Sequence, residues 1–153
     1  HKMAVGLKLK KNKLEKIKIF LHQKFLQYDQ NLFKKIFVYD SELSVNQINS
    51  QFLNILDMME PYGKGNEEPI FLVKDIIKEK IKTIKERHIL IFFQNDNGLY
   101  LKGIMFNVKN TELFDYLLKY KKFKFEFLCT VKRDNFSNND TPQIHISDAR
   151  VIN

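Results

Sequence analysis

The sequence predicts an α+β protein in which a truncated βαβα lobe is followed by a five-stranded β-barrel. The first observation is that apolar residues recur at helical spacing in two stretches of the first sixty residues. The second is that the apolar period changes to two beyond residue 70, as in strands. The third is a stiff turn with two Gly and two Pro between these regions. We therefore divide the chain into a lobe at 1–60, a connector at 61–69 and a barrel domain at 70–153.

The lobe begins with residues 3–9, which alternate weakly and predict a short strand. Asn12 and Glu15 have the spacing of a capping box, so a helix is expected from there to about Asp29. Phe33–Tyr39 is rich in aromatic and β-branched residues, which predicts a second strand. The apolar stripe of the helix consists of Leu14, Ile17, Leu21, Phe25 and Tyr28.

A second helix of the lobe is indicated by another capping-box pair, Ser44 and Gln47. Pro61 and Gly63 stop this helix. The lobe is thus a βαβα unit without the neighbouring strands that would complete its sheet. The apolar stripe of the second helix consists of Val45, Ile48, Phe52, Ile55, Leu56 and Met59.

The barrel domain begins with Phe71–Ile84. Its Lys and Glu residues suggest a helix, whereas its isoleucines favour a long bent strand, and we adopt the strand. His88–Gln94 and Leu99–Phe106 predict two strands joined across Asn95–Gly98, because an Asn-Gly pair is a strong hairpin signal. Thr111 then caps a short helix.

Two more strands complete the barrel domain. Gln143–Ile152 is the last of them. In the strand before it, apolar residues alternate with charged ones, so we expect their shared face to be the barrel interior. Five strands with a helix between the third and the fourth is the order of an OB-fold. The alternating apolar residues are Phe123, Phe125, Phe127, Cys129 and Val131.

The chain carries a net charge of +8, and its 26 basic residues include only three Arg. A nucleic-acid partner explains this balance, but abundant Lys, Asn, Ile and Phe are equally typical of an AT-rich genome, so the charge leaves the choice open. The single Cys cannot form an internal disulfide. No apolar run approaches the roughly 18 residues of a membrane span, and no signal-peptide pattern is present. These features predict a soluble cytoplasmic protein without a membrane partner.

The residue pattern offers no catalytic or metal site. The four His are dispersed without the spacing of a zinc site, and the acidic residues do not cluster in a two-metal pattern. Asp148 is expected to pair with the backbone or with Arg150. Gly63 and Gly65 lack the strand-to-helix context of a phosphate loop. We therefore expect no catalytic residue, no metal and no bound cofactor in this chain.

Binding is better supported than catalysis. OB-folds hold single strands with cations along the backbone and with aromatic rings under the bases. Tyr100, Phe136 and Phe93 are the aromatic residues that we expect to be accessible. Arg133 beside Asn135 and Phe136 combines a guanidinium, an amide and a ring, which suits a contact to both backbone and base. For each Lys, a solvated face is the alternative. The predicted DNA-binding residues are Tyr100, Lys102, Lys132, Arg133, Asn135 and Phe136.

The connector region carries a resemblance to a known family. Glu60–Phe71 reads E-P-Y-G-K-G-N-E-E-P-I-F and resembles the P-F-G-x-G-N-x-E-P-x-F connector of bacterial RecJ, the single-stranded-DNA-specific exonuclease of the DHH phosphoesterase superfamily. Tyr62 replaces the usual Phe. Upstream, His1–Leu7 resembles the end of the G-G-H-x-x-A-A-G element of the DHHA1 domain, without its glycines and with Val5 in place of the second Ala. The pieces that follow the order of the family's OB domain are Arg87–Leu90, Lys102–Phe106, Asn135–Phe136 and Gln143–Asp148.

The resemblance implies the C-terminal part of a RecJ-type enzyme, with a partial DHHA1-like lobe before an OB-fold that positions single-stranded DNA. It also implies 5′-to-3′ hydrolysis of that DNA in repair and recombination, by a DHH domain that would use Mg or Mn and is not within these residues. His1 would approach the substrate phosphate. Because the chain begins at His1, we interpret it as a C-terminal fragment that is inactive alone, and a tag remnant before Met3 is the alternative.

Two other functions stay open. An interaction module would use the OB surface to dock a DNA-repair or single-strand-binding protein instead of DNA, and a decayed gene would have no function. DNA binding predicts a steep salt dependence of affinity, because phosphate contacts release counterions. Docking by apolar contacts predicts a weak one. We expect single-stranded DNA as the main partner, a single-strand-binding protein as a second one, and a monomeric chain.

Overall fold

In this computed structural model the described residues are 5–34, 36–94, 98, 100–119, 124–135 and 141–152, with only the backbone described at 75 and 77–79. Two compact units make up the chain, His1–Ile36 and Phe37–Asn153. The units divide at residue 36, whereas the predicted boundary lies at residue 60. Residues 37–60 fall within the second unit, because a strand and a helix from this stretch pack into its core.

The first unit contains the α-helix α1 (Leu14–Leu26), which lies between the 3-10 turns η1 (Lys11–Lys13) and η2 (Gln30–Phe33). The predicted helix is confirmed, but no side chain caps its N-terminus, so the predicted capping box at its start is wrong. Residues 5–10 have no regular structure. The predicted βαβα lobe is therefore not confirmed in the described residues, because the stretches expected as strands form extended chain and a 3-10 turn.

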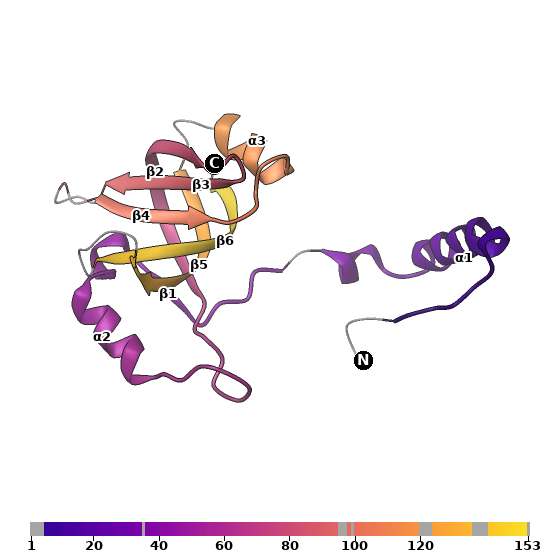
Figure 1. The fold of residues 1–153 in the computed structure, drawn as a ribbon, viewed down its shortest axis with the longest axis horizontal. Helices are drawn as coiled ribbons and strands as arrows, with labels where there is room; N and C mark the ends of the chain where they lie inside the picture. The colour runs from indigo at the N-terminus through magenta and orange to yellow at the C-terminus, as the bar shows by residue number, and fades with distance from the viewer. Residues whose placement is uncertain are drawn as a thin grey trace. The chain divides into compact units, whose positions relative to one another are not determined.

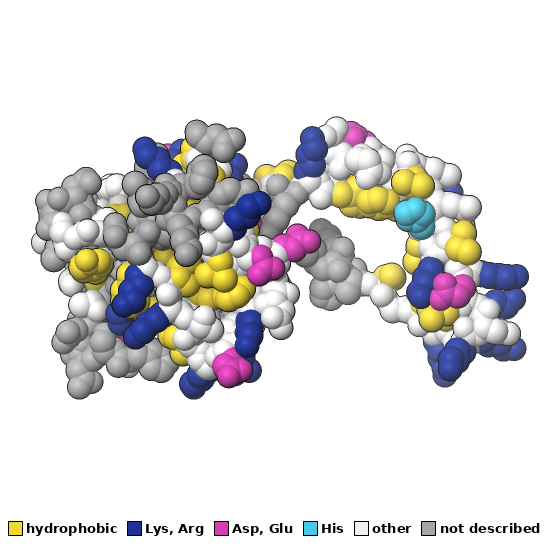
Figure 2. Space-filling view, turned by 90° about the horizontal axis from the view of Figure 1, so that it is seen from above, with side chains coloured by type: hydrophobic (Ala, Val, Ile, Leu, Met, Phe, Trp, Pro, Cys, Tyr) yellow, Lys and Arg dark blue, Asp and Glu magenta, His cyan; other side chains and the backbone are white. Residues whose placement is uncertain are grey.

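α1 keeps its apolar stripe at the surface of the first unit. The helix has no buried residue, and Leu21 and Phe25 are exposed. Phe25 contacts Phe33 of η2, with the ring centroids 4.4 Å apart. Figure 2 shows uncovered hydrophobic side chains of this unit beside Lys side chains. Within the described part of the first unit, packing contributes little to the stability of the helix.

The second unit is built on a six-stranded sheet with the order β1-β2-β3-β4-β6-β5 and a further pairing of β2 with β5 (Figure 1). β2 pairs with β5 along its first half and with β3 along its second half, and its register shifts twice. The pairings therefore run from strand to strand and return to β2. β1–β2 and β4–β6 are parallel, and the other pairs are antiparallel. The strands are β1 (Ser41–Leu43), β2 (Phe71–Ile84), β3 (His88–Gln94), β4 (Tyr100–Met105), β5 (Lys124–Arg133) and β6 (Pro142–Ile152).

The order of elements after residue 70 confirms the prediction. β2 is the long bent strand expected there, and α3 (Glu112–Lys119) lies between β4 and β5 in the chain. Thr111 caps α3, because its Oγ1 accepts a hydrogen bond from the N–H of Phe114 at 3.3 Å. Phe125 and Phe127 are fully buried, as the alternation in β5 predicts. Phe123 and the turn residues 95–97 lie outside the described residues.

The stretch before the connector packs on the sheet as a short strand and a helix. β1 pairs in parallel with the start of β2. The Ser44–Gln47 capping box is confirmed, but it closes the 3-10 turn η3 (Val45–Gln47), and α2 (Ser50–Met58) follows with its own cap. Leu53 and Leu56 on α2 are buried in the same core as the barrel strands. This burial places α2 in the second unit.

The connector is a hydrogen-bonded turn that holds the end of α2. Gly63 and Asn66 exchange backbone hydrogen bonds of 2.8 and 3.0 Å. The Asn66 amide donates to the carbonyls of Met59 at 2.8 Å and Pro61 at 3.0 Å. The Tyr62 hydroxyl donates to the Leu56 carbonyl at 2.8 Å. The side chains that make this motif recognisable therefore stabilise a turn, which agrees with a structural role for the motif.

Candidate nucleic-acid interface

The outward face of β3 and β4 carries aromatic and basic side chains. Phe93 and Leu101 are buried, so their neighbours Phe92, Tyr100 and Lys102 lie on the opposite face of the sheet. Phe92 is the register partner of Lys102. The expectation that Phe93 is accessible is wrong, because its side chain is fully buried against Phe127 with the ring centroids 5.1 Å apart.

β2 adds two lysines to this face. Lys80 is the register partner of Phe92, and together with Lys82 and Tyr100 these residues line an open groove of about 550 Å³. Tyr100 is 65% exposed. We call this set of four residues, Lys80, Lys82, Phe92 and Tyr100, the outer platform. Two rings and two ammonium groups, with no carboxylate among the lining residues, form the combination that stacks bases and binds phosphates.

Sequence reasoning found Tyr100 but missed the other members of the outer platform. The stretch around Lys80 was ambiguous between helix and strand, so its alternation had no assigned phase. Ile81 packs against the core between the two lysines, and this apolar residue between Lys80 and Lys82 is the signal that indicates an outward pair. For Phe92, an error of one residue in the phase of β3 exchanged it with its buried neighbour.

Lys102 is tied to the protein itself. Its ammonium group makes an ion pair with Asp134, just beyond β5. The Asp134 side chain is only 1% exposed, whereas Lys102 is 30% exposed. A buried carboxylate requires such a partner, because an unpaired buried charge is costly. The structure therefore gives Lys102 a structural role in addition to its place beside the outer platform.

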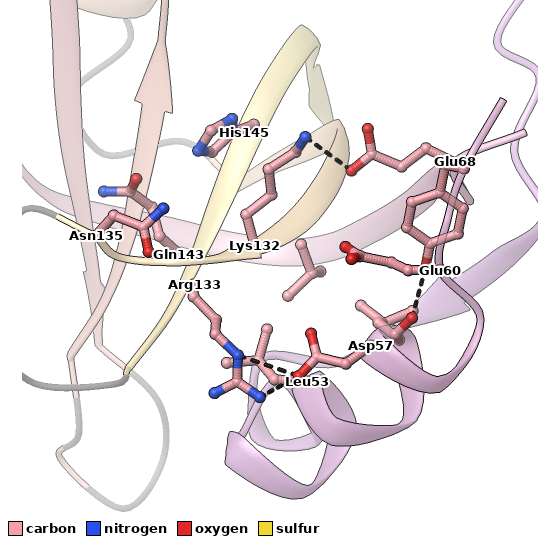
Figure 3. Close-up of a pocket in the computed structure, with 12 residues that line it drawn as sticks. Leu53, Asp57, Glu60, Glu68, Lys132, Arg133, Asn135, Gln143 and His145 are labelled. Atoms are coloured by element: carbon pink, nitrogen blue, oxygen red, sulfur yellow. Dashed lines mark hydrogen bonds and ion pairs between the residues drawn. The ribbon is translucent and has the colours of Figure 1, made fainter.

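A pocket of about 350 Å³ lies between α2 and the strands β5 and β6 (Figure 3). Arg133 reaches α2 there, and its guanidinium donates to Asp57, with Nε 3.1 Å from Oδ2, and to Asn54 at 2.9 Å. Asn135 also lines the pocket. Phe136 lies outside the described residues. The predicted cluster of guanidinium, amide and ring is thus only partly described, and its guanidinium is engaged within the protein.

The pocket is rich in carboxylates. Lys132 pairs with Glu68 at 3.0 Å, and Figure 3 shows this pair at the upper edge of the pocket. Asp57, Glu60 and Glu68 face two basic side chains. Burial raises the pKa of the Tyr62 hydroxyl, and these three carboxylates raise it further. The pocket as a whole therefore disfavours a phosphate group, in contrast to the outer platform.

Two histidines flank an exposed ring near the far end of β4. Phe106 is 50% exposed, with ring centroids 5.3 Å from His88 and 5.4 Å from His145. Burial, and after it the nearby Lys132, lowers the pKa of His145, so its imidazole is neutral at pH 7. His88 Nδ1 accepts a hydrogen bond from the N–H of Asn107 at 3.0 Å, which gives this side chain a structural role.

The described residues fit no metal site, since no group of three or more His, Cys, Asp or Glu side chains among them lies close enough to hold an ion. Asp148 Oδ1 accepts from the N–H of Ala149 at 2.9 Å, which confirms its predicted backbone partner. Arg150 pairs instead with Glu126. His1 lies outside the described residues. No helix in the described part of the chain is long and apolar enough to cross a membrane.

Comparison with known families gives one match. A model of the RecJ OB domain matches residues 39–148. No curated protein sequence matches the chain. The matched range begins just before β1 and ends within β6, so it includes α2 and the outer platform.

Several solved structures are similar in fold. RecJ from Thermus thermophilus in complex with Mn²⁺ has a TM-score of 0.61 and 16% identity over 95% of this chain and 20% of that one. The same enzyme with Mg²⁺ has a TM-score of 0.48, with 18% identity over 71% of this chain and 15% of that one. Asparaginyl-tRNA synthetase from Entamoeba histolytica has a TM-score of 0.43, with 15% identity over 56% and 21%. This chain thus spans about a fifth or less of these proteins, and the likeness to the first of them shows a shared fold.

Proposed function

This chain belongs to the RecJ OB domain family, and on that premise we propose that its second unit binds single-stranded DNA along the outer platform. The observation that carries the proposal is the placement of Tyr100 and Phe92 between and beside two outward lysines. Bases stack on such rings whatever their sequence, and the ammonium groups bind phosphates. The proposed substrate class is therefore single-stranded DNA, with little sequence preference.

We further propose that this binding positions DNA for a RecJ-type exonuclease that acts in the cytoplasm, in repair and recombination. The residues described here fit no metal ion, so hydrolysis and its Mg or Mn ions belong to a different domain in this proposal. The contribution of this chain is to hold the strand. Stacking is worth roughly 1–3 kcal/mol per base, which supports the weak, salt-sensitive binding of a guiding surface.

Titration of a labelled oligonucleotide with the whole chain, at two salt concentrations, tests the proposal. The Tyr100→Ala variant is expected to lose about 1–3 kcal/mol of binding free energy. The Lys80→Ala/Lys82→Ala variant is expected to bind every sequence more weakly, with a salt slope flatter by about 0.7 for each lost phosphate contact. Duplex DNA is expected to bind less tightly than single strands, because its bases are not available for stacking.

The matched control removes two exposed lysines elsewhere, as Lys34→Ala/Lys64→Ala. It lowers the net charge by the same amount and is expected to change affinity less than the platform variant. Equal losses in the two double variants would show that only net charge matters and would contradict the proposal. Retained affinity in Tyr100→Ala together with a flat salt dependence of the parent would favour docking of a protein partner through this surface.

A further inference from the structure

The cations predicted to bind phosphate are already paired with carboxylates, and they differ in how easily they can change partner. Lys102 is paired with Asp134, whose side chain is 1% exposed. Releasing Lys102 would leave a buried charge alone, which is strongly unfavourable. Arg133 is bound to both Asp57 and Asn54 of α2, so its release would also detach it from the helix.

Lys132 has the partner that is easiest to exchange. Its ion pair with Glu68 is 3.0 Å long, and the two side chains are 43% and 32% exposed. Exposed ion pairs contribute little to stability, because both groups are well solvated when they separate. Glu68 leaves the pair at little cost, since Asp57 and Glu60 line the same pocket and repel it.

The sheet places Lys132 in line with the outer platform. Lys80 on β2 is the register partner of Phe92 on β3, which pairs with Lys102 on β4. Lys102 pairs with Gln143 on β6, and Gln143 pairs with Lys132 on β5. Register partners point to the same face of a sheet. Lys132 is thus three strands beyond Phe92, roughly 14 Å along the sheet at about 4.8 Å per strand.

We propose that Glu68 occupies, in the free protein, the place that a DNA phosphate takes on Lys132. The inference rests on the proposed function of the outer platform and extends its binding track across β4 and β6 to β5. A phosphate that approaches along the outward face displaces the carboxylate, and Glu68 then faces solvent. The connector residue Glu68 therefore sets how strongly, and over how long a segment, the chain holds a single strand.

The Glu68→Gln variant tests this exchange. Titrated with the same labelled oligonucleotide, it is expected to bind roughly two- to fivefold more tightly at low salt, because the phosphate no longer competes with a carboxylate. Its salt slope is expected to be steeper than or equal to that of the parent, by up to about 0.7 for the fully gained phosphate contact. In the Lys132→Ala background, Glu68→Gln is expected to give no gain, because the group that exchanges partners is absent.

The matched control is Glu67→Gln, which removes the same charge from the neighbouring exposed residue. A gain in Glu67→Gln as large as that in Glu68→Gln, or a gain that persists without Lys132, would overturn the exchange. If the parent binds single strands and Glu68→Gln leaves its affinity unchanged, the exchange fails while the proposed function stands. If the parent shows no salt-dependent binding at all, the proposed function itself fails.

Discussion

Replacement of Gly103 by Ala tests whether the sheet packs as closely as the structure shows. A Cβ atom at Gly103 would lie 2.7 Å from Ile146 Cδ1, 2.8 Å from Phe93 Cε2 and 3.1 Å from Ile144 Cγ1. The first two distances are far inside van der Waals contact, and all three neighbours are almost fully buried. Their side chains therefore have little room to move away, and the substitution overpacks the core under the outer platform.

The expected cost follows from two opposing contributions. Overpacking a well-packed core costs about 1–3 kcal/mol. Replacing Gly by Ala also restricts the unfolded chain, which stabilises the protein by about 0.4–1 kcal/mol where the backbone permits Ala. Gly103 does not need a positive φ, so this second contribution applies. We therefore expect Gly103→Ala to lower the free energy of unfolding by about 1–2 kcal/mol.

Urea unfolding followed by circular dichroism measures this change as a lower midpoint at an unchanged slope. Gly63→Ala is the matched control, because nothing lies within 4 Å of a Cβ at Gly63 and its φ is not positive. This control is expected to change stability by a few tenths of a kcal/mol at most. A Gly103→Ala variant as stable as the parent would refute the close packing of β4 against β6 and β3.

The remaining predictions concern the buried ion pair and the chemistry of the chain. Lys102→Ala leaves Asp134 buried without this partner and is expected to destabilise the fold by about 3–5 kcal/mol; Lys102→Ala/Asp134→Ala is expected to recover part of the loss, and no recovery in urea unfolding would contradict the structural role of the pair. Purified chain incubated with labelled single strands and Mg²⁺ or Mn²⁺ is expected to release no nucleotides, since the described residues fit no metal. Metal-dependent release that persists through further purification would contradict this.

Local signals in the sequence were sufficient for much of the second unit. The alternation around Phe127 placed β5 and its buried face correctly. The Ser44–Gln47 pair marked a real cap, and Thr111 marked the start of α3. Each of these features depends on residues within a few positions of one another, so its energetic basis is contained in a short stretch.

The errors concern contacts between distant segments. β1 is only three residues long, and its Ser-Glu-Leu sequence has no strand pattern. It forms because Ser41 pairs with Phe71, thirty residues further on. Phe33–Tyr39 has a better strand composition but does not form a strand in its described part. Strand composition therefore indicates a strand only where a partner edge is available, and the sequence does not reveal that edge.

The candidate site shows the same limit for charged residues. Nothing in the sequence distinguishes Lys80, which lines the outer platform, from Lys102, which is paired with a buried carboxylate 32 residues away. Arg133 looked like the best phosphate ligand but reaches Asp57, which is 76 residues earlier in the chain. A basic residue binds DNA only if the fold leaves its charge unmatched or matched by a partner that can leave. That property follows from tertiary structure alone.

The connector links the most recognisable sequence feature to the proposed regulation of binding. Asn66 and Tyr62 fix the turn to the end of α2 through three hydrogen bonds to backbone carbonyls. Glu68 follows two residues later and pairs with Lys132 across the pocket. Because the turn is held at its other end, Glu68 has a short and defined range of positions, which keeps its carboxylate near Lys132 even after displacement. The same rigidity that makes the motif recognisable would thus make the competition between carboxylate and phosphate reversible.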